Sequence, residues 1–128
     1  MLVALAVAGC AVDDGRFFVT SVEPPTGEVA YPSSTVWVAF SDPPDPLACA
    51  DAFTLAAMVD GVEAAWVEPI EVVPGAGTGA WTIDHDPLTV GMTYALVVAA
   101  GPGGCRSVLG EQLEPFSTLF QVVERADL

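Results

Sequence analysis

Proline and glycine are spread along the whole chain, and this distribution constrains the fold more than any other feature. The 128 residues include 11 prolines and 12 glycines, and the turns that they favour leave no room for a long helix. Between these turns, apolar and polar residues alternate with the period of two that a half-buried strand requires. The segments expected to be strands are residues 17–22, 36–40, 53–59, 62–67, 81–83, 94–98 and 116–122. The sequence therefore predicts an all-β fold.

The connections between these segments indicate how the strands are arranged. Asp60-Gly61 separates two apolar segments, and Asp-Gly in that position predicts a tight hairpin. One helical turn is expected over residues 48–52, where small residues dominate. About seven short antiparallel strands separated by turns predict an immunoglobulin-like β-sandwich over residues 17–128. The length suits a single domain.

The charge of the chain excludes several classes of function. Seventeen acidic residues stand against three basic ones and none of these is lysine, giving a formal net charge of −14. Such a chain is repelled by phosphate, so we expect no nucleic-acid partner and no basic patch for anionic lipid. The single histidine, His85, cannot build the usual zinc or copper sites. No serine stands in the context of a catalytic nucleophile, so we expect no enzymatic activity.

The first ten residues carry the most specific chemical signal. Residues 1–9 are uncharged and apolar and end in small residues directly before Cys10, and they are too short to span a bilayer. Val7-Ala8-Gly9-Cys10 resembles the lipobox of bacterial lipoproteins, in which the cysteine is acylated after the signal is removed. No basic residue precedes the apolar run, so residues 1–9 are expected to be an N-terminally truncated signal. A buried N-terminal strand is the alternative.

This resemblance implies lipidation of Cys10, followed by a short tether to residue 16. Two or three acyl chains give durable membrane anchoring where one chain does not. Ala11 differs from the aspartate that retains enterobacterial lipoproteins in the inner membrane, so the resemblance slightly favours the outer membrane.

Lipidation of Cys10 resolves an odd number of cysteines. The chain has three, and an exported protein with one unpaired thiol is exposed to unwanted oxidation. With Cys10 acylated, Cys49 and Cys105 remain and are predicted to form a disulfide. The alternative is a pair of buried free thiols in a cytosolic protein.

Turn and core residues follow one another in a distinctive order from about residue 19 to 123. These are Ser21-Val22-Glu23-Pro24-Pro25-Thr26-Gly27, Pro32, Val36 to Ser41, Pro44-Asp45-Pro46, Pro87-Leu88, Gly91, Thr93-Tyr94, Leu96, Val98, Gly110, Leu113 and Phe116. Their order and spacing resemble a known family, the bacterial Ig-like domains of surface-layer proteins, adhesins and lipoproteins. The family shares no catalytic residues, so the resemblance implies a fold rather than a reaction. Cys49 and Cys105 depart from the family pattern and are expected to join two loops at one end of the sandwich.

Calcium and glycans are the ligands considered for the candidate side chains. Asp42 with Asp45, or Asp84 with Asp86, could supply hard oxygen ligands for calcium. Neither pair matches a standard calcium loop, and acidic loops also serve simply to keep an exported domain soluble. Trp37 lies on the strand face opposite Val36 and Val38 and is the candidate for an exposed, sugar-stacking aromatic, whereas Trp81 is expected in the core.

These observations predict a lipid-anchored, non-catalytic protein of the bacterial envelope with one Ig-like domain. Its role is expected to be structural or adhesive, with a protein or glycan at the cell surface as partner and no obligatory cofactor. The alternative is an accessory module that binds a glycan or calcium within a larger envelope complex.

Overall fold

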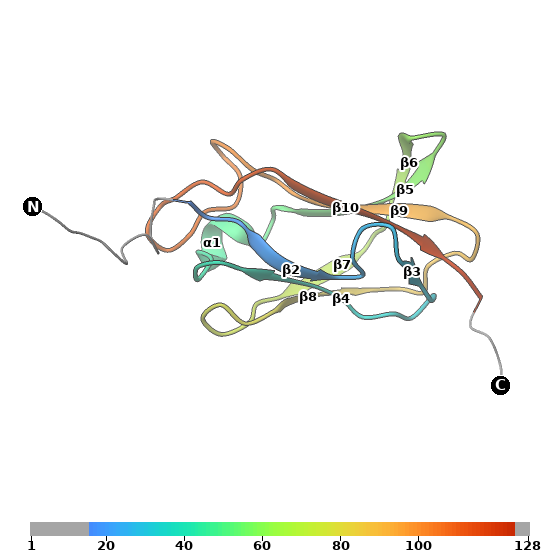
Figure 1. Ribbon diagram of the computed structural model, residues 1–128, viewed down its shortest axis with the longest axis horizontal. Helices are drawn as coiled ribbons and strands as arrows, with labels where there is room; N and C mark the ends of the chain where they lie inside the picture. The colour runs from blue at the N-terminus through green and yellow to red at the C-terminus, as the bar shows by residue number, and fades with distance from the viewer. Residues whose placement is uncertain (1–15, 125–128) are drawn as a thin grey trace, which may run out of the picture.

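The computed structural model describes residues 16–124, which fold into two β-sheets packed face to face (Figure 1). One sheet has four strands in the order β2-β4-β8-β7, and the other has five in the order β3-β10-β9-β5-β6. The elements are β2 (Val19–Glu23), β3 (Val29–Ala30), β4 (Val36–Phe40), α1 (Pro46–Cys49), β5 (Phe53–Val59), β6 (Val62–Trp66), β7 (Ile70–Val73), β8 (Trp81–His85), β9 (Thr93–Val98) and β10 (Phe116–Val122). The predicted all-β sandwich is confirmed.

The strand order is that of the immunoglobulin fold. An immunoglobulin domain places strands A, B, E and D in one sheet and C, F and G in the other, and β2, β4, β8, β7 and β5, β9, β10 occupy these positions in turn. The structure adds β6 beside β5, and β3 on the far edge, where it pairs with β10 in parallel. This parallel pair and β7 were absent from the seven antiparallel strands that the sequence predicted.

Alternation explains which side chains enter the core. In β4, Val36, Val38 and Phe40 are buried while Trp37 and Ala39 are half-buried on the other face. In β10, Thr118, Phe120 and Val122 are buried in the same way. This is the pattern expected of strands with one face on the core.

Two local signals in the sequence give the structures expected of them, one with a shift. Asp60 and Gly61 form the β5–β6 turn with φ of 54° and 79°, the left-handed pair that a two-residue hairpin requires. The helical turn predicted at residues 48–52 begins two residues earlier, at Pro46. Asp45 caps it by accepting a 2.9 Å hydrogen bond from the Leu47 amide, and proline is favoured in the first helical turn because it needs no partner for an N–H.

The two ends of the sandwich differ, and we name them by their most visible element. The α1 end holds α1 and the loop between β9 and β10, and the hairpin end holds the β5–β6 turn (Figure 1). At the α1 end, Cys49 and Cys105 form a fully buried disulfide with a Cα–Cα distance of 4.3 Å. It joins two loops at one end of the sandwich, as predicted, instead of bridging strands B and F as in antibody domains.

Tyr94 in β9 fixes the loop that precedes it. Its ring is buried and stacks on Phe120 at a centroid distance of 6.0 Å, and its hydroxyl accepts a 2.8 Å hydrogen bond from the Thr89 amide. A tyrosine near the start of strand F that bonds to backbone a few residues upstream is the tyrosine corner of immunoglobulin-like domains.

Loss of the disulfide is expected to destabilise the fold. Its two cysteines are separated by 56 residues, and closing a loop of this length removes about 4 kcal/mol of chain entropy from the unfolded state. We expect the Cys49→Ala/Cys105→Ala variant to show a free energy of unfolding in urea lower by about 2–4 kcal/mol. The Cys10→Ala variant serves as the control, and equal urea midpoints for the double variant and wild type would contradict the prediction.

Removing the hydroxyl of Tyr94 is expected to weaken the corner without emptying the core. Tyr94→Phe leaves the ring in place but takes away the acceptor of the Thr89 amide, at a cost of about 1–2 kcal/mol. Thermal unfolding of Tyr94→Phe and of wild type measures the effect. A Tyr94→Phe variant as stable as wild type would show that the hydrogen bond contributes nothing.

Candidate functional site

Cys10, the residue predicted to be lipidated, lies outside the described residues. The first residue that the structure describes is Arg16. Its guanidinium donates to both carboxylate oxygens of Glu114, from Nε to Oε2 at 2.7 Å and from Nη2 to Oε1 at 3.1 Å. The central carbon of the guanidinium group, Cζ, also lies 4.8 Å from the centre of the Phe18 ring. The next residue, Phe17, is fully buried and bridges to Leu113. The chain therefore enters the domain at the α1 end through a fixed point.

The two ends differ in whether they carry basic side chains. Both basic residues of the described chain are at the α1 end, where Arg16 pairs with Glu114 and the Arg106 carbonyl accepts a 2.8 Å hydrogen bond from the Asp45 amide. No Lys or Arg occurs between residues 17 and 105. Among residues 16–124, the charged side chains at the hairpin end are acidic and include Asp60, Glu63, Glu68 and Asp86.

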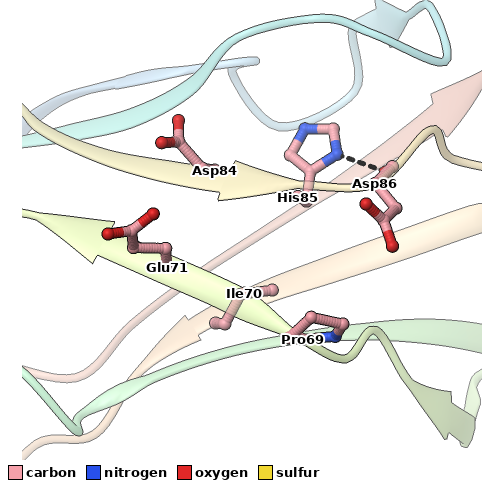
Figure 2. Close-up of a pocket in the computed structure, with 6 residues that line it drawn as sticks. All are labelled: Pro69, Ile70, Glu71, Asp84, His85 and Asp86. Carbon is pink, nitrogen blue, oxygen red and sulfur yellow. Dashed lines mark hydrogen bonds between the residues drawn. The ribbon is translucent and has the colours of Figure 1, made fainter.

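A hollow of about 340 Å³ lies over the neighbouring strands β7 and β8 and contains the single histidine (Figure 2). Glu71 and Asp84 stand directly opposite each other in the β7–β8 pairing, and like charges in that position repel each other. In Figure 2 the carboxylates of Asp84 and Asp86 point in different directions. The acidic residue that faces Asp84 across the strand pair is therefore Glu71, which the sequence did not indicate.

His85 is half-buried, and both of its ring nitrogens face backbone carbonyls. Nδ1 lies 2.7 Å from the Asp86 carbonyl oxygen and Nε2 lies 3.0 Å from the Ser34 carbonyl oxygen. The hydroxyl of Ser34 accepts a 2.7 Å hydrogen bond from the Tyr31 amide. Because neither ring nitrogen of His85 faces a hydroxyl, the arrangement does not form the nucleophile–base pair of a hydrolase.

The aspartates considered for calcium have other partners or neighbours. The Asp45 carboxylate caps α1, and that of Asp42 accepts a 3.1 Å hydrogen bond from the Ser41 hydroxyl. Across residues 16–124, no three His, Cys, Asp or Glu side chains are grouped closely enough to hold a metal ion. The described part of the chain therefore offers no built calcium site.

The glycine-rich segment between β7 and β8 is a tight turn. The Gly79 amide donates a 2.7 Å hydrogen bond to the Ala76 carbonyl, and a Cβ on Gly75 would collide with the Ala80 carbonyl oxygen. Glycine is therefore required here by the close approach of the backbone to itself.

The three tryptophans occupy three different environments. Trp81 is 1% exposed and lies in the core, as predicted. Trp37, the predicted candidate for an exposed aromatic, is half-buried on the outer face of β4. The tryptophan with the most exposed surface is Trp66 on the edge strand β6, with 61% of its surface accessible. The sequence pattern placed it in a strand but gave no sign that both faces of this strand would be exposed.

Within residues 16–124, no helix is long and apolar enough to cross a membrane.

The ion pair that fixes the N-terminal segment is expected to depend on pH. Hydrogen bonds from Arg16 hold the pKa of the Glu114 carboxyl below its ordinary value. A carboxyl with a lowered pKa stabilises the folded chain above its unfolded pKa, and this contribution disappears as the pH falls through the folded value. We expect Glu114→Gln to lower Tm slightly at about pH 7, because exposed pairs contribute little, and not at all at about pH 2. Glu28→Gln is the matched control, and a Tm difference that is independent of pH would contradict this explanation.

No family model matches the chain, and no curated protein sequence matches it. Solved structures do resemble it. The S-layer protein rSbsC(31-844) superposes with a TM-score of 0.60 at 23% identity, covering 87% of this chain and 14% of that chain. Domains 1–6 of surface layer protein SbsC give a TM-score of 0.61 at 23% identity with the same coverage. The N-terminal part of the bacterial S-layer protein SbsC gives 0.56 at 25%, covering 84% of this chain and 24% of that one. The chain thus spans less than a quarter of each of these proteins, and the likeness shows a shared domain fold.

Proposed function

We propose that this chain is a lipid-anchored protein of the bacterial envelope whose single Ig-like domain has a structural or adhesive role and catalyses no reaction. The observation that carries the proposal is the buried disulfide between Cys49 and Cys105. Disulfides persist in exported proteins and are rare in the cytosol. Because the disulfide uses two of the three cysteines, Cys10 is the remaining one, and it follows directly on the small residues that a lipobox requires.

The position of the chain entry supports anchoring from one end. Arg16 is six positions after Cys10 in the sequence and is held at the α1 end by Glu114. An anchor on Cys10 would place the α1 end, with both described arginines, toward the membrane. The hairpin end, with its acidic side chains, would then point away from it.

The fold likeness supports the class of role. The similar structures are those of an S-layer protein, and an Ig-like sandwich presents a stable surface without needing a reaction site. We propose the outer membrane over the inner membrane only on the identity of Ala11.

Lipidation is tested by metabolic labelling with a palmitate analogue in a bacterium, using the full chain with a short basic segment placed before Met1. We expect strong labelling of wild type and none of Cys10→Ala, because only the thiol of Cys10 accepts the acyl group. The Cys49→Ala/Cys105→Ala variant is the matched control and should keep its label per molecule of protein. Equal labelling of wild type and Cys10→Ala would overturn the anchor.

A further inference from the structure

The edge strand β6 is an unusually open part of the sandwich. All five of its residues are exposed, although its neighbour β5 is largely buried. It forms the outer edge of the five-stranded sheet, and Figure 1 shows the β5–β6 hairpin projecting beyond the body of the domain. Edge strands are commonly protected by lysine, proline or a bulge. β6 contains neither lysine nor proline, and its bulge, between Glu63 and Ala65, lies before the segment at Trp66. Its backbone is therefore accessible to a further strand.

The hydrogen-bond pattern shows which backbone groups face outward at the end of β6. Just after β6, the Val67 amide donates a 2.8 Å hydrogen bond to the Leu55 carbonyl of β5. Because successive residues of an antiparallel strand face opposite sides, Trp66 presents its N–H and C=O to the open edge. These are the groups that an added strand would use.

A hollow of about 360 Å³ adjoins this edge. Apolar groups line most of it, from Trp66, Leu88, Met92 and Tyr94, and Glu68 and Asp86 add two carboxylates to the lining. The indole of Trp66 is held in place because its Nε1 donates a 3.1 Å hydrogen bond to Glu63 Oε1. An exposed but positioned aromatic ring between carboxylates is the environment that binds an organic cation with an apolar stem.

Charge distinguishes between the possible occupants of this surface. A second copy pairing through β6 would bring its own Asp60 and Glu63 against those of the first copy, and like charges facing each other are unfavourable. No Lys or Arg occurs between residues 17 and 105, so the β5–β6 hairpin of another copy offers no basic group of its own. A basic partner is attracted by the same charges.

We propose that the hairpin end binds an extended, lysine- or arginine-bearing segment of a partner protein. The segment pairs with the free edge of β6, and one of its cationic side chains lies in the hollow against Trp66. This proposal names a partner for the adhesive role and rests on that role for its cellular setting. The binding is measured in vitro and lipidation by labelling, so failure of one is distinguishable from failure of the other.

The direct test uses the purified full chain and a synthetic nonapeptide in which lysine alternates with threonine. Trp66 is much more exposed than Trp37 or Trp81, so quenching of tryptophan fluorescence by acrylamide reports mainly on Trp66. We expect the peptide to reduce quenching and to slow hydrogen exchange of the Trp66 amide. A peptide of the same composition with its lysines grouped at one end should bind much more weakly, and equal binding would overturn strand pairing.

Variants separate the hollow from general charge. We expect Trp66→Ala to weaken binding about tenfold, through loss of the cation–π contact, and Glu68→Gln to weaken it by about threefold or more. Leu47→Ala and Asp51→Asn are the matched controls, because both residues are exposed near the α1 end, and both should bind as wild type does. Binding that is insensitive to Trp66→Ala, or reduced equally by Asp51→Asn and Glu68→Gln, would overturn the proposal.

Discussion

A cluster of aromatic side chains joins the two sheets, and the rest of the structure depends on this contact. Phe40 and Trp81 lie on one sheet and Phe53 on the other, with Trp81 stacked on Phe53 at 5.9 Å and edge-on to Phe40 at 6.1 Å. Burying such rings contributes a large part of the stability of a small domain. The contact is strong enough to retain a buried indole Nε1 on Trp81 that has no hydrogen-bond partner among the described residues, at a cost of about 1–3 kcal/mol.

The aromatic cluster also explains why the two ends differ. Phe17 stacks on Phe40 at a centroid distance of 5.4 Å, so the cluster extends toward the α1 end. The disulfide lies at the same end, and its Cys49 precedes Phe53 by four positions in the sequence. At the hairpin end, the aromatic pair is Tyr94 with Phe120, and both belong to the five-stranded sheet. Aromatic contacts across the sheets are therefore concentrated near α1, and the hollow beside Trp66 lies at the other end.

The sequence predicted the strands with strong local patterns and missed β3, whose pairing depends on a distant strand, and β7, whose pattern is short. β4 and β10 alternate clearly and were predicted with the observed bounds, as was the mostly apolar β5. β3 has two residues and exists because β10 pairs with it, which no local pattern indicates. β7 alternates over Ile70–Val73 between Pro69 and Pro74, a signal that was present but short.

The same reasoning explains which site residues could be predicted. Cys49 and Cys105 followed from counting cysteines, because pairing in an exported protein needs no knowledge of the fold. Glu71 could not be placed beside Asp84 once β7 had been missed. Trp66 was assigned to a strand, but its exposure depends on β6 being an edge strand with both faces open, and this is a property of the packed structure.

The net charge of −14 connects the open edge with the solubility of the domain. An exposed strand with Val62 and Trp66 on it, 66% and 61% accessible, invites pairing between copies. Here the protection comes from charge near the strand instead of from lysine or proline within it, because the acidic groups around β6 repel an identical edge. Protection of this kind is selective: it acts against every acidic copy of the chain but not against a basic segment. The charges that oppose pairing between copies would therefore leave the edge open to the basic segment proposed above.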